Sequence, residues 1–144
     1  VGARSRGAGA GAGMIEAALD APEGAMTLRV KGHARFAAPG SDIVCAAASA
    51  LVWAAIGSVE ELSARGGLTG APVLRAEKGT AYIHARAKPG AAAYLAGAAG
   101  AVEAGFRRLS EGFPDNVHFT GGHADIPAGA EKMEELYEKQ RSGL

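Results

Sequence analysis

The strongest constraint on the fold is a long apolar stretch in the middle of the chain, DIVCAAASALVWAAIGSVEELSARGG, at residues 42–67. Ser41 and Asp42 are good helix N-caps, and Gly66 and Gly67 are typical of a helix end. Between them, apolar residues recur at intervals of three and four, the spacing of one helical face; they are Val44, Ala48, Leu51, Ala55, Val59 and Leu62. We therefore predict a long helix with one face in the core.

Strand patterns lie on both sides of this helix. Residues 14–19 and 25–33 flank a turn signal, and apolar and polar side chains alternate in the second segment. Residues 71–77 and 80–87 flank a Lys-Gly turn in the same way. Each pair of segments is expected to form a β-hairpin.

A second helix is predicted from about Ala91 to Glu111, and a last strand at residues 116–122. The apolar stripe of this helix consists of Leu95, Ala98, Val102, Phe106, Leu109 and Phe113. Residues 129–142 are expected to form a polar terminal helix.

The predicted order β-β-α-β-β-α-β indicates an α+β fold: a largely antiparallel sheet with two main helices on one face, followed by a polar C-terminal helix. We expect a single domain over residues 14–122. Residues 1–13, which are rich in Gly and Ala, are expected to be a disordered N-terminal extension or a remnant of cloning. Residues 123–144 are expected to hold a loop and the C-terminal helix.

Charge and cysteine content narrow the function classes. The 144 residues include 15 basic and 15 acidic side chains, and this balance lacks the basic surface that duplex nucleic acid requires. A single cysteine cannot form an internal disulfide, and a free thiol favours a reducing, cytoplasmic location. No run approaches the ~18 apolar residues of a membrane span, because Glu60 and Glu61 end the apolar stretch. We expect a cytoplasmic protein with no direct nucleic-acid or membrane partner.

The only cysteine, Cys45, falls in the first turn of the predicted long helix, and His33 precedes it at the end of a strand. Free N–H groups and the positive dipole end of a helix start favour a thiolate over a thiol. A histidine brought close by the intervening loop could take and return a proton. The same two residues also fit a buried structural cysteine and an exposed histidine, and their spacing alone does not decide between the two.

Other uses of the thiol and the histidines fit the sequence less well. The four histidines, His33, His84, His118 and His123, show none of the short paired spacings of a zinc site. We therefore expect no metal and no cofactor. A redox-sensing thiol would use the same activated cysteine, but the chain has no second cysteine to form an intramolecular disulfide.

The segment GHARFAAPGSDIVCAAASAL, at residues 32–51, resembles the signature of the Prp-type ribosomal-processing cysteine protease family. In that signature a Gly-His-Ala triplet is followed by a loop and then by Asp-Ile-Val-Cys-Ala-Ala-x-Ser. This chain has the triplet at residues 32–34, Gly40 in the loop, the Asp-Ile-Val-Cys-Ala-Ala block at residues 42–47, and Ser49 after it. The order of strands and helices over most of the chain is also similar to that of the family.

The resemblance implies roles for five residues. Cys45 would be the nucleophile and His33 the general base, with Gly32, Asp42 and Ser49 as supporting groups. Asp42 could cap the helix or orient the imidazole, Ser49 could present its hydroxyl one turn after Cys45, and Gly32 could leave room for a substrate backbone. Backbone N–H groups at the helix start could also form an oxyanion hole.

The resemblance further implies the substrate and the partners. Family members remove a short N-terminal extension from large-subunit ribosomal protein L twenty-seven, cutting after a pair of aromatic residues, and they are homodimers. The alternative is a non-catalytic ribosome-assembly or binding protein that shares the fold and keeps Cys45 as a structural thiol. The joint presence of His33, Asp42, Cys45 and Ser49 argues against that alternative.

Overall fold

The computed structural model describes residues 13–121 and confirms the predicted order of strands and helices. Its elements are β1 (Ile15–Asp20), β2 (Ala25–Lys31), α1 (Ile43–Ala64), β3 (Val73–Glu77), β4 (Thr80–Arg86), the 3-10 turn η1 (Pro89–Ala91), α2 (Ala92–Gly112) and β5 (Val117–Gly121). The predictions made for residues 1–12 and 122–144, including the C-terminal helix, lie outside the described residues.

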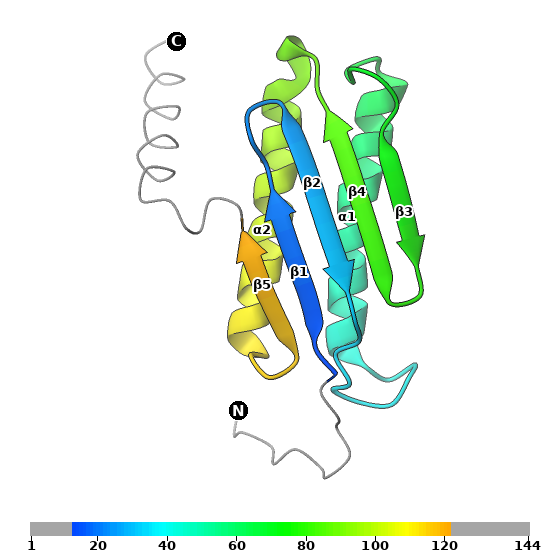
Figure 1. Cartoon of the computed structure of the whole chain (residues 1–144), viewed down its shortest axis with the longest axis vertical. Coiled ribbons are helices and arrows are strands. Elements are labelled where there is room, and N and C mark those ends of the chain that lie inside the picture. The colour runs from blue at the N-terminus through cyan, green and yellow to red at the C-terminus, as the bar shows by residue number, and fades with distance from the viewer. Residues whose placement is uncertain (1–12, 122–144) are drawn as a thin grey trace.

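The five strands form one sheet in the order β3-β4-β2-β1-β5. The pairs β3·β4, β4·β2 and β2·β1 are antiparallel, whereas β5 runs parallel to β1. A parallel neighbour requires a crossover connection, which α2 supplies between β4 and β5. Figure 1 shows α1 and α2 side by side on one face of the sheet. The fold is therefore α+β with a largely antiparallel sheet, as predicted.

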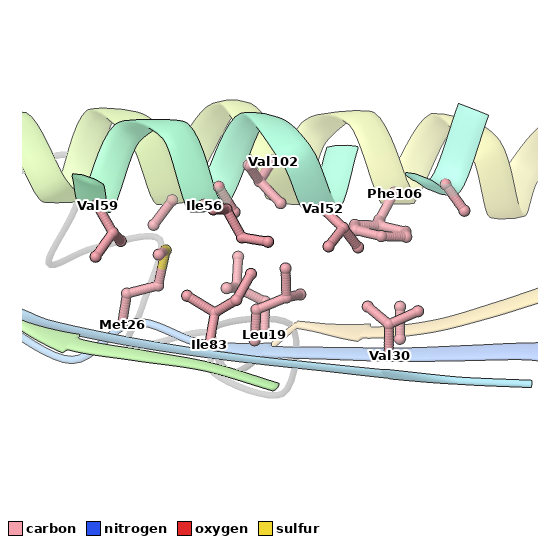
Figure 2. Close-up of a cluster of buried hydrophobic side chains, with 14 of the residues drawn as sticks. Leu19, Met26, Val30, Val52, Ile56, Val59, Ile83, Val102 and Phe106 are labelled. Carbon is pink, nitrogen blue, oxygen red and sulfur yellow. The ribbon is translucent and has the colours of Figure 1, made fainter. Parts of the chain in front are cut away.

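The core lies between the two helices and the covered face of the sheet. Figure 2 shows Val52, Ile56 and Val59 of α1 pointing toward the sheet, and Met26 and Ile83 pointing back at them. The buried residues of α1 are Val44, Ala48, Val52, Ala55, Ile56, Val59 and Leu62. Because buried apolar side chains supply most of the stabilisation of a domain this size, these contacts set how α1 is placed on the sheet.

Four residues of the predicted stripes are only half-buried: Leu51, Ala98, Leu109 and Phe113. Leu51 is half-buried, because it faces α2 rather than the sheet: a Cβ at Gly105 would lie 2.3 Å from Leu51 Cδ2. On α2, Ala99 is buried and Ala98 only half-buried. Gly105 thus permits close approach of the two helices, which explains at least one of the glycines of α2.

Helix α1 is apolar along most of its length. With a mean hydropathy of 1.8, the helix is long and apolar enough to cross a membrane by length and composition, which the sequence prediction did not anticipate. Its buried face packs on the sheet, however, and core helices of globular domains pass the same test. Its outward face leaves Trp53 64% exposed.

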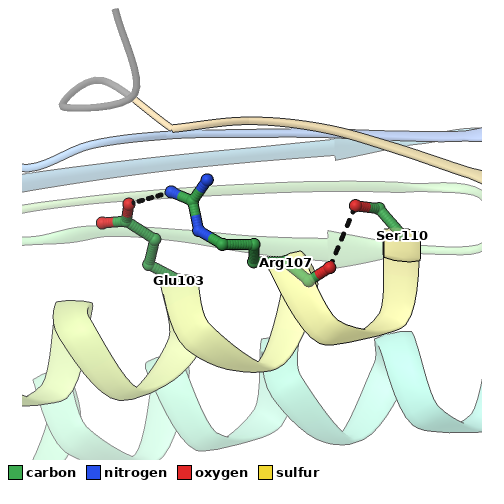
Figure 3. Close-up of polar contacts among 3 residues, drawn as sticks. All are labelled: Glu103, Arg107 and Ser110. Carbon is green, nitrogen blue, oxygen red and sulfur yellow. Dashed lines mark hydrogen bonds and ion pairs between the residues drawn. The ribbon is translucent and has the colours of Figure 1, made fainter. Parts of the chain in front are cut away.

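Contacts between α2 and β5 hold the last strand at the edge of the sheet. Figure 3 shows Arg107 of α2 bonded to Glu103 one turn earlier, at 2.6 Å. The Arg107 guanidinium also lies 5.6 Å from the centre of the Phe119 ring, and the Phe106 ring stacks on the Phe119 ring with 5.9 Å between the ring centres. Aromatic and cation–π contacts of this kind contribute about 0.5–1.5 kcal/mol each, so they strengthen the pairing of β5.

Gly32 and Gly40, two glycines of the β2–α1 loop, offer a matched test of how closely Met14 approaches this loop. Both have a positive φ, of +96° and +86°, but a Cβ at Gly32 would lie 2.2 Å from Met14 O, whereas one at Gly40 would meet nothing within 4 Å. We expect Gly40→Ala to lower the free energy of unfolding by about 1–2 kcal/mol through backbone strain, and Gly32→Ala by about 3 kcal/mol or more, because the clash adds to the strain. Urea denaturation of both variants measures the difference, and equal losses would contradict the close approach of Met14.

Candidate active site

The five residues singled out from the sequence line one cleft. The cleft has a volume of about 870 Å³ and lies where β2 ends and α1 begins, next to the β3–β4 turn. In Figure 1 this is the lower edge of the sheet, where the cyan loop joins β2 to α1. Gly32, His33, Asp42, Cys45 and Ser49 all contribute to its lining.

Cys45 lies half-buried in the first turn of α1, as predicted. Its Sγ accepts a hydrogen bond from the backbone N–H of Ala34 at 3.3 Å. Ala34 is fully buried and directly follows His33 in the chain. The loop after β2 therefore folds back onto the start of α1, which is what a Cys/His pair at this spacing requires.

His33 is exposed and also lines the cleft. Its imidazole packs over Gly79 of the β3–β4 turn: a Cβ at Gly79 would lie 2.9 Å from His33 Nε2. Among the residues that the structure describes, His33 and Cys45 share no hydrogen bond. An exposed side chain changes rotamer within nanoseconds, and catalytic hydrogen bonds are often looser without substrate, so the shared cleft is the significant observation.

Asp42 joins the helix start to the loop through both of its carboxylate oxygens. Oδ1 accepts from the backbone N–H of Val44 and Cys45 at 3.0 and 2.9 Å, which makes Asp42 the N-cap of α1. Oδ2 accepts from the N–H of Phe36 and Ala37 at 2.9 and 3.3 Å. Burial acts to raise the pKa of Asp42, but these four N–H donors outweigh it and hold the pKa below the ordinary value of 3.8.

The same contacts bear on the expected oxyanion hole. The N–H groups of Val44 and Cys45 donate to the Asp42 carboxylate, and that of Ala46 donates to the Asp42 carbonyl at 3.0 Å. Donors already engaged in the cap, or in the first backbone bond of the helix, are not free for a developing oxyanion. The helix-start amides of these three residues therefore do not supply the hole in this arrangement.

The other two predicted residues, Ser49 and Gly32, also line the cleft. Ser49 is exposed in the cleft one turn after Cys45. Gly32 lines the cleft as well, but the space beside it is taken by the carbonyl of Met14 rather than left open. The chain's own backbone is thus a sufficient reason for glycine here, and the role of Gly32 toward a substrate stays a prediction.

Sequence reasoning missed three residues of this region. Gly79 was expected in a turn, but nothing in its spacing indicated that the turn would meet His33. Trp53 lines the cleft two turns after Cys45, a position visible from helical periodicity once the helix start is known. Asn116, in the α2–β5 connection, donates from Nδ2 to Ala34 O at 2.8 Å, and no sequence signal pointed to it.

Asp42→Asn separates the two functions of the carboxylate. Asparagine keeps an oxygen for the cap but turns an amide NH₂ toward the Phe36 and Ala37 N–H groups, so we expect a loss of about 1 kcal/mol near neutral pH. Because the folded-state pKa of Asp42 is depressed, the advantage of the wild type is complete above the unfolded-state pKa and is lost as pH falls through the folded-state pKa, below 3.8. Asp42→Ala should cost about 1 kcal/mol more, because it also removes the cap.

Urea unfolding of the three proteins from neutral pH down to about pH 3 checks this expectation. A stability difference between wild type and Asp42→Asn that does not shrink in acid would contradict it.

Comparisons with known proteins show the family to which the chain belongs. The sequence matches the family model described as cysteine protease Prp over residues 14–118. No curated protein matches the chain. Among solved structures, the ribosomal processing protease Prp from S. aureus with a covalently linked product peptide is similar at 23% identity and a TM-score of 0.55, covering 75% of this chain and 99% of that one.

Two further structures show the same fold. One is SMU.848 from Streptococcus mutans, at 24% identity and a TM-score of 0.54, covering 76% of this chain and 94% of that one. The other is the S. aureus protease with a substrate peptide, at 22% identity and a TM-score of 0.52, covering 75% of this chain and 99% of that one. Because the family model matches well over half of the 144 residues, this chain belongs to the Prp cysteine protease family.

Proposed function

We propose that this chain is a ribosomal-processing endopeptidase that removes a short N-terminal extension from large-subunit ribosomal protein L twenty-seven. Cys45 is the nucleophile and His33 the general base, with Gly32, Asp42 and Ser49 in support. The observation that carries the proposal is that Cys45 and His33, which come from different elements, line the same cleft. The S. aureus neighbour is a ribosomal processing protease and was solved with a substrate peptide.

The chemistry follows the order usual for a thiol nucleophile. His33 takes the proton of the Cys45 thiol, and the thiolate attacks the carbonyl carbon of the scissile peptide bond. The tetrahedral intermediate collapses as the imidazolium returns the proton to the leaving amine, which leaves a thioester on Cys45. Water, deprotonated by His33, then hydrolyses the thioester and releases the acid product, so that thiol and imidazole return to their starting forms.

The shape and lining of the cleft suit an extended peptide with apolar side chains. Its walls include Val30, Val52 and Trp53, and the Trp53 ring is largely exposed. Such surfaces favour aromatic and aliphatic partners, because apolar area leaves water on binding. This supports cleavage next to a pair of aromatic residues. A cytoplasmic location, where the thiol stays reduced, completes the proposal.

Peptides that span the N-terminus of the ribosomal protein from the same genome test the function. We expect Cys45→Ala to abolish cleavage, and His33→Ala to lower kcat by roughly 10²–10⁴ without changing the melting temperature, because His33 is exposed. His118→Ala is the matched control, since His118 is exposed on β5 and does not line the cleft. Mass spectrometry of the products measures both rate and cleavage position.

Cleavage by Cys45→Ala at the wild-type rate would overturn the assignment of the nucleophile, and normal turnover by His33→Ala would overturn that of the base. If the wild-type protein binds the peptides without cutting any of them, the non-catalytic binding protein becomes the better description.

The proposal includes a homodimer formed through the outward helix surface. A shallow apolar hollow there is lined by Ser58 of α1 and by Ala93, Tyr94, Gly97 and Ala98 of α2, and Tyr94 is 46% exposed. Small residues around an exposed ring let the same surface of a second copy approach closely. We expect sedimentation equilibrium to give twice the chain mass of 14.4 kDa, and Ala93→Glu to give the monomer. A monomeric wild type at micromolar concentration would contradict the dimer.

A further inference from the structure

The backbone of Ala34 makes two hydrogen bonds to side chains, one through its N–H and one through its carbonyl. The Ala34 N–H donates to Cys45 Sγ at 3.3 Å, and the Ala34 carbonyl accepts from Asn116 Nδ2 at 2.8 Å. The Asn116 amide is therefore linked to the cysteine sulfur through a single residue. Among residues 13–121, Cys45 and Asn116 are the two side chains that hydrogen-bond to Ala34.

The backbone next to Ala34 has an unfavourable conformation. Arg35, immediately after Ala34, has a φ of +49°, the only positive value of a non-glycine residue in the described chain. Gly32, two residues before Ala34, has a φ of +96°. A non-glycine residue in the left-handed region costs about 1–3 kcal/mol and persists only where neighbouring contacts impose it. The Asn116 bond to the Ala34 carbonyl is placed to impose that conformation.

Asn116 is itself fixed by its backbone. Its N–H donates to Phe113 O at 2.9 Å, and its carbonyl accepts from the N–H of Ile15 at 2.8 Å. The same connection supports the loop a second time, because the ring of Phe36 meets that of Phe113 edge-on at 5.2 Å. Backbone hydrogen bonds thus hold Asn116 where β1, α2 and β5 meet, and its side chain reaches the loop from there.

We propose that Asn116 is a positioning residue of this active site: by holding the Ala34 carbonyl, it directs the Ala34 N–H at the sulfur of Cys45. The inference rests on the proposed function in taking Cys45 as the reactive thiol. An N–H donates more strongly to a thiolate than to a thiol, so correct placement of this donor supports the reactive form. It also fixes the backbone that carries His33, one residue away.

Three variants distinguish positioning from mere stability. Asn116→Ala removes the donor and leaves the Ala34 carbonyl without its partner. Asn116→Asp keeps the size but sets a carboxylate oxygen against that carbonyl. Phe106→Leu, in the core between α2 and β5, is the control, because it lowers stability through a buried side chain that has no group to hydrogen-bond with Ala34.

The readout is the rate at which Cys45 reacts with dipyridyl disulfide, a thiol reagent that works in acid as well as at neutral pH. We expect Asn116→Ala to slow the reaction about tenfold near neutral pH, Asn116→Asp to slow it more, and Phe106→Leu to leave it unchanged while lowering the melting temperature. In Asn116→Asp the rate relative to wild type should recover as pH falls toward the carboxyl pKa of about 4, because the protonated acid can again donate to the carbonyl. In Asn116→Ala the same ratio should not rise as pH falls, because alanine gains no donor on acidification.

Wild-type reactivity in folded Asn116→Ala, or an Asn116→Asp ratio without recovery in acid, would overturn the proposal. The wild-type protein gives an independent check if a variant fails to fold: slow exchange of the Asn116 side-chain amide protons supports the bond to Ala34, and exchange at the rate of a free amide overturns it. These measurements need no peptide substrate. Failure to cleave any peptide would therefore count against the proposed function and leave this inference standing.

Discussion

The site depends first on the carboxylate of Asp42, which bonds in two directions at once. One oxygen caps α1 and the other binds the N–H groups of Phe36 and Ala37, so a single side chain joins the helix that carries Cys45 to the loop that follows His33. Each bond contributes only about 1 kcal/mol. Their common acceptor matters more, because the loop and the helix start cannot move apart without leaving several N–H groups unpaired.

The rest of the structure places this junction where a peptide can reach it. Both helices cover one face of the sheet, and the core between them leaves the lower edge of Figure 1 to loops and turns. Backbone groups are free of ladder hydrogen bonds at strand ends, so this edge can offer its own atoms to side chains such as Asp42 and Asn116. Close contacts of two glycines, Gly32 with Met14 and Gly79 with His33, draw the neighbouring segments together there.

The two residues proposed to react are held very differently. Cys45 is half-buried in the first turn of a long helix, and its sulfur receives a backbone N–H. His33 is exposed and rests against a glycine turn, free of a bond to the cysteine. An exposed base beside a half-buried nucleophile suits the peptide hydrolysis proposed for this chain, because the base must reach the thiol, the leaving amine and the water in turn.

The sequence alone predicted the strands and the two long helices of residues 13–121, and five residues that line the cleft. The periodicity from Val44 to Leu62 and the caps around it predict α1, since local spacing decides which face of a helix is apolar. The motif from Gly32 to Ser49 carried the family, which the match over residues 14–118 shows. Only the tertiary structure decided that β5 pairs in parallel with β1, that Leu51 faces Gly105, and that Asn116 reaches Ala34. These contacts join residues far apart in the chain, and their partners are selected by how α2 crosses the sheet, which no local pattern records.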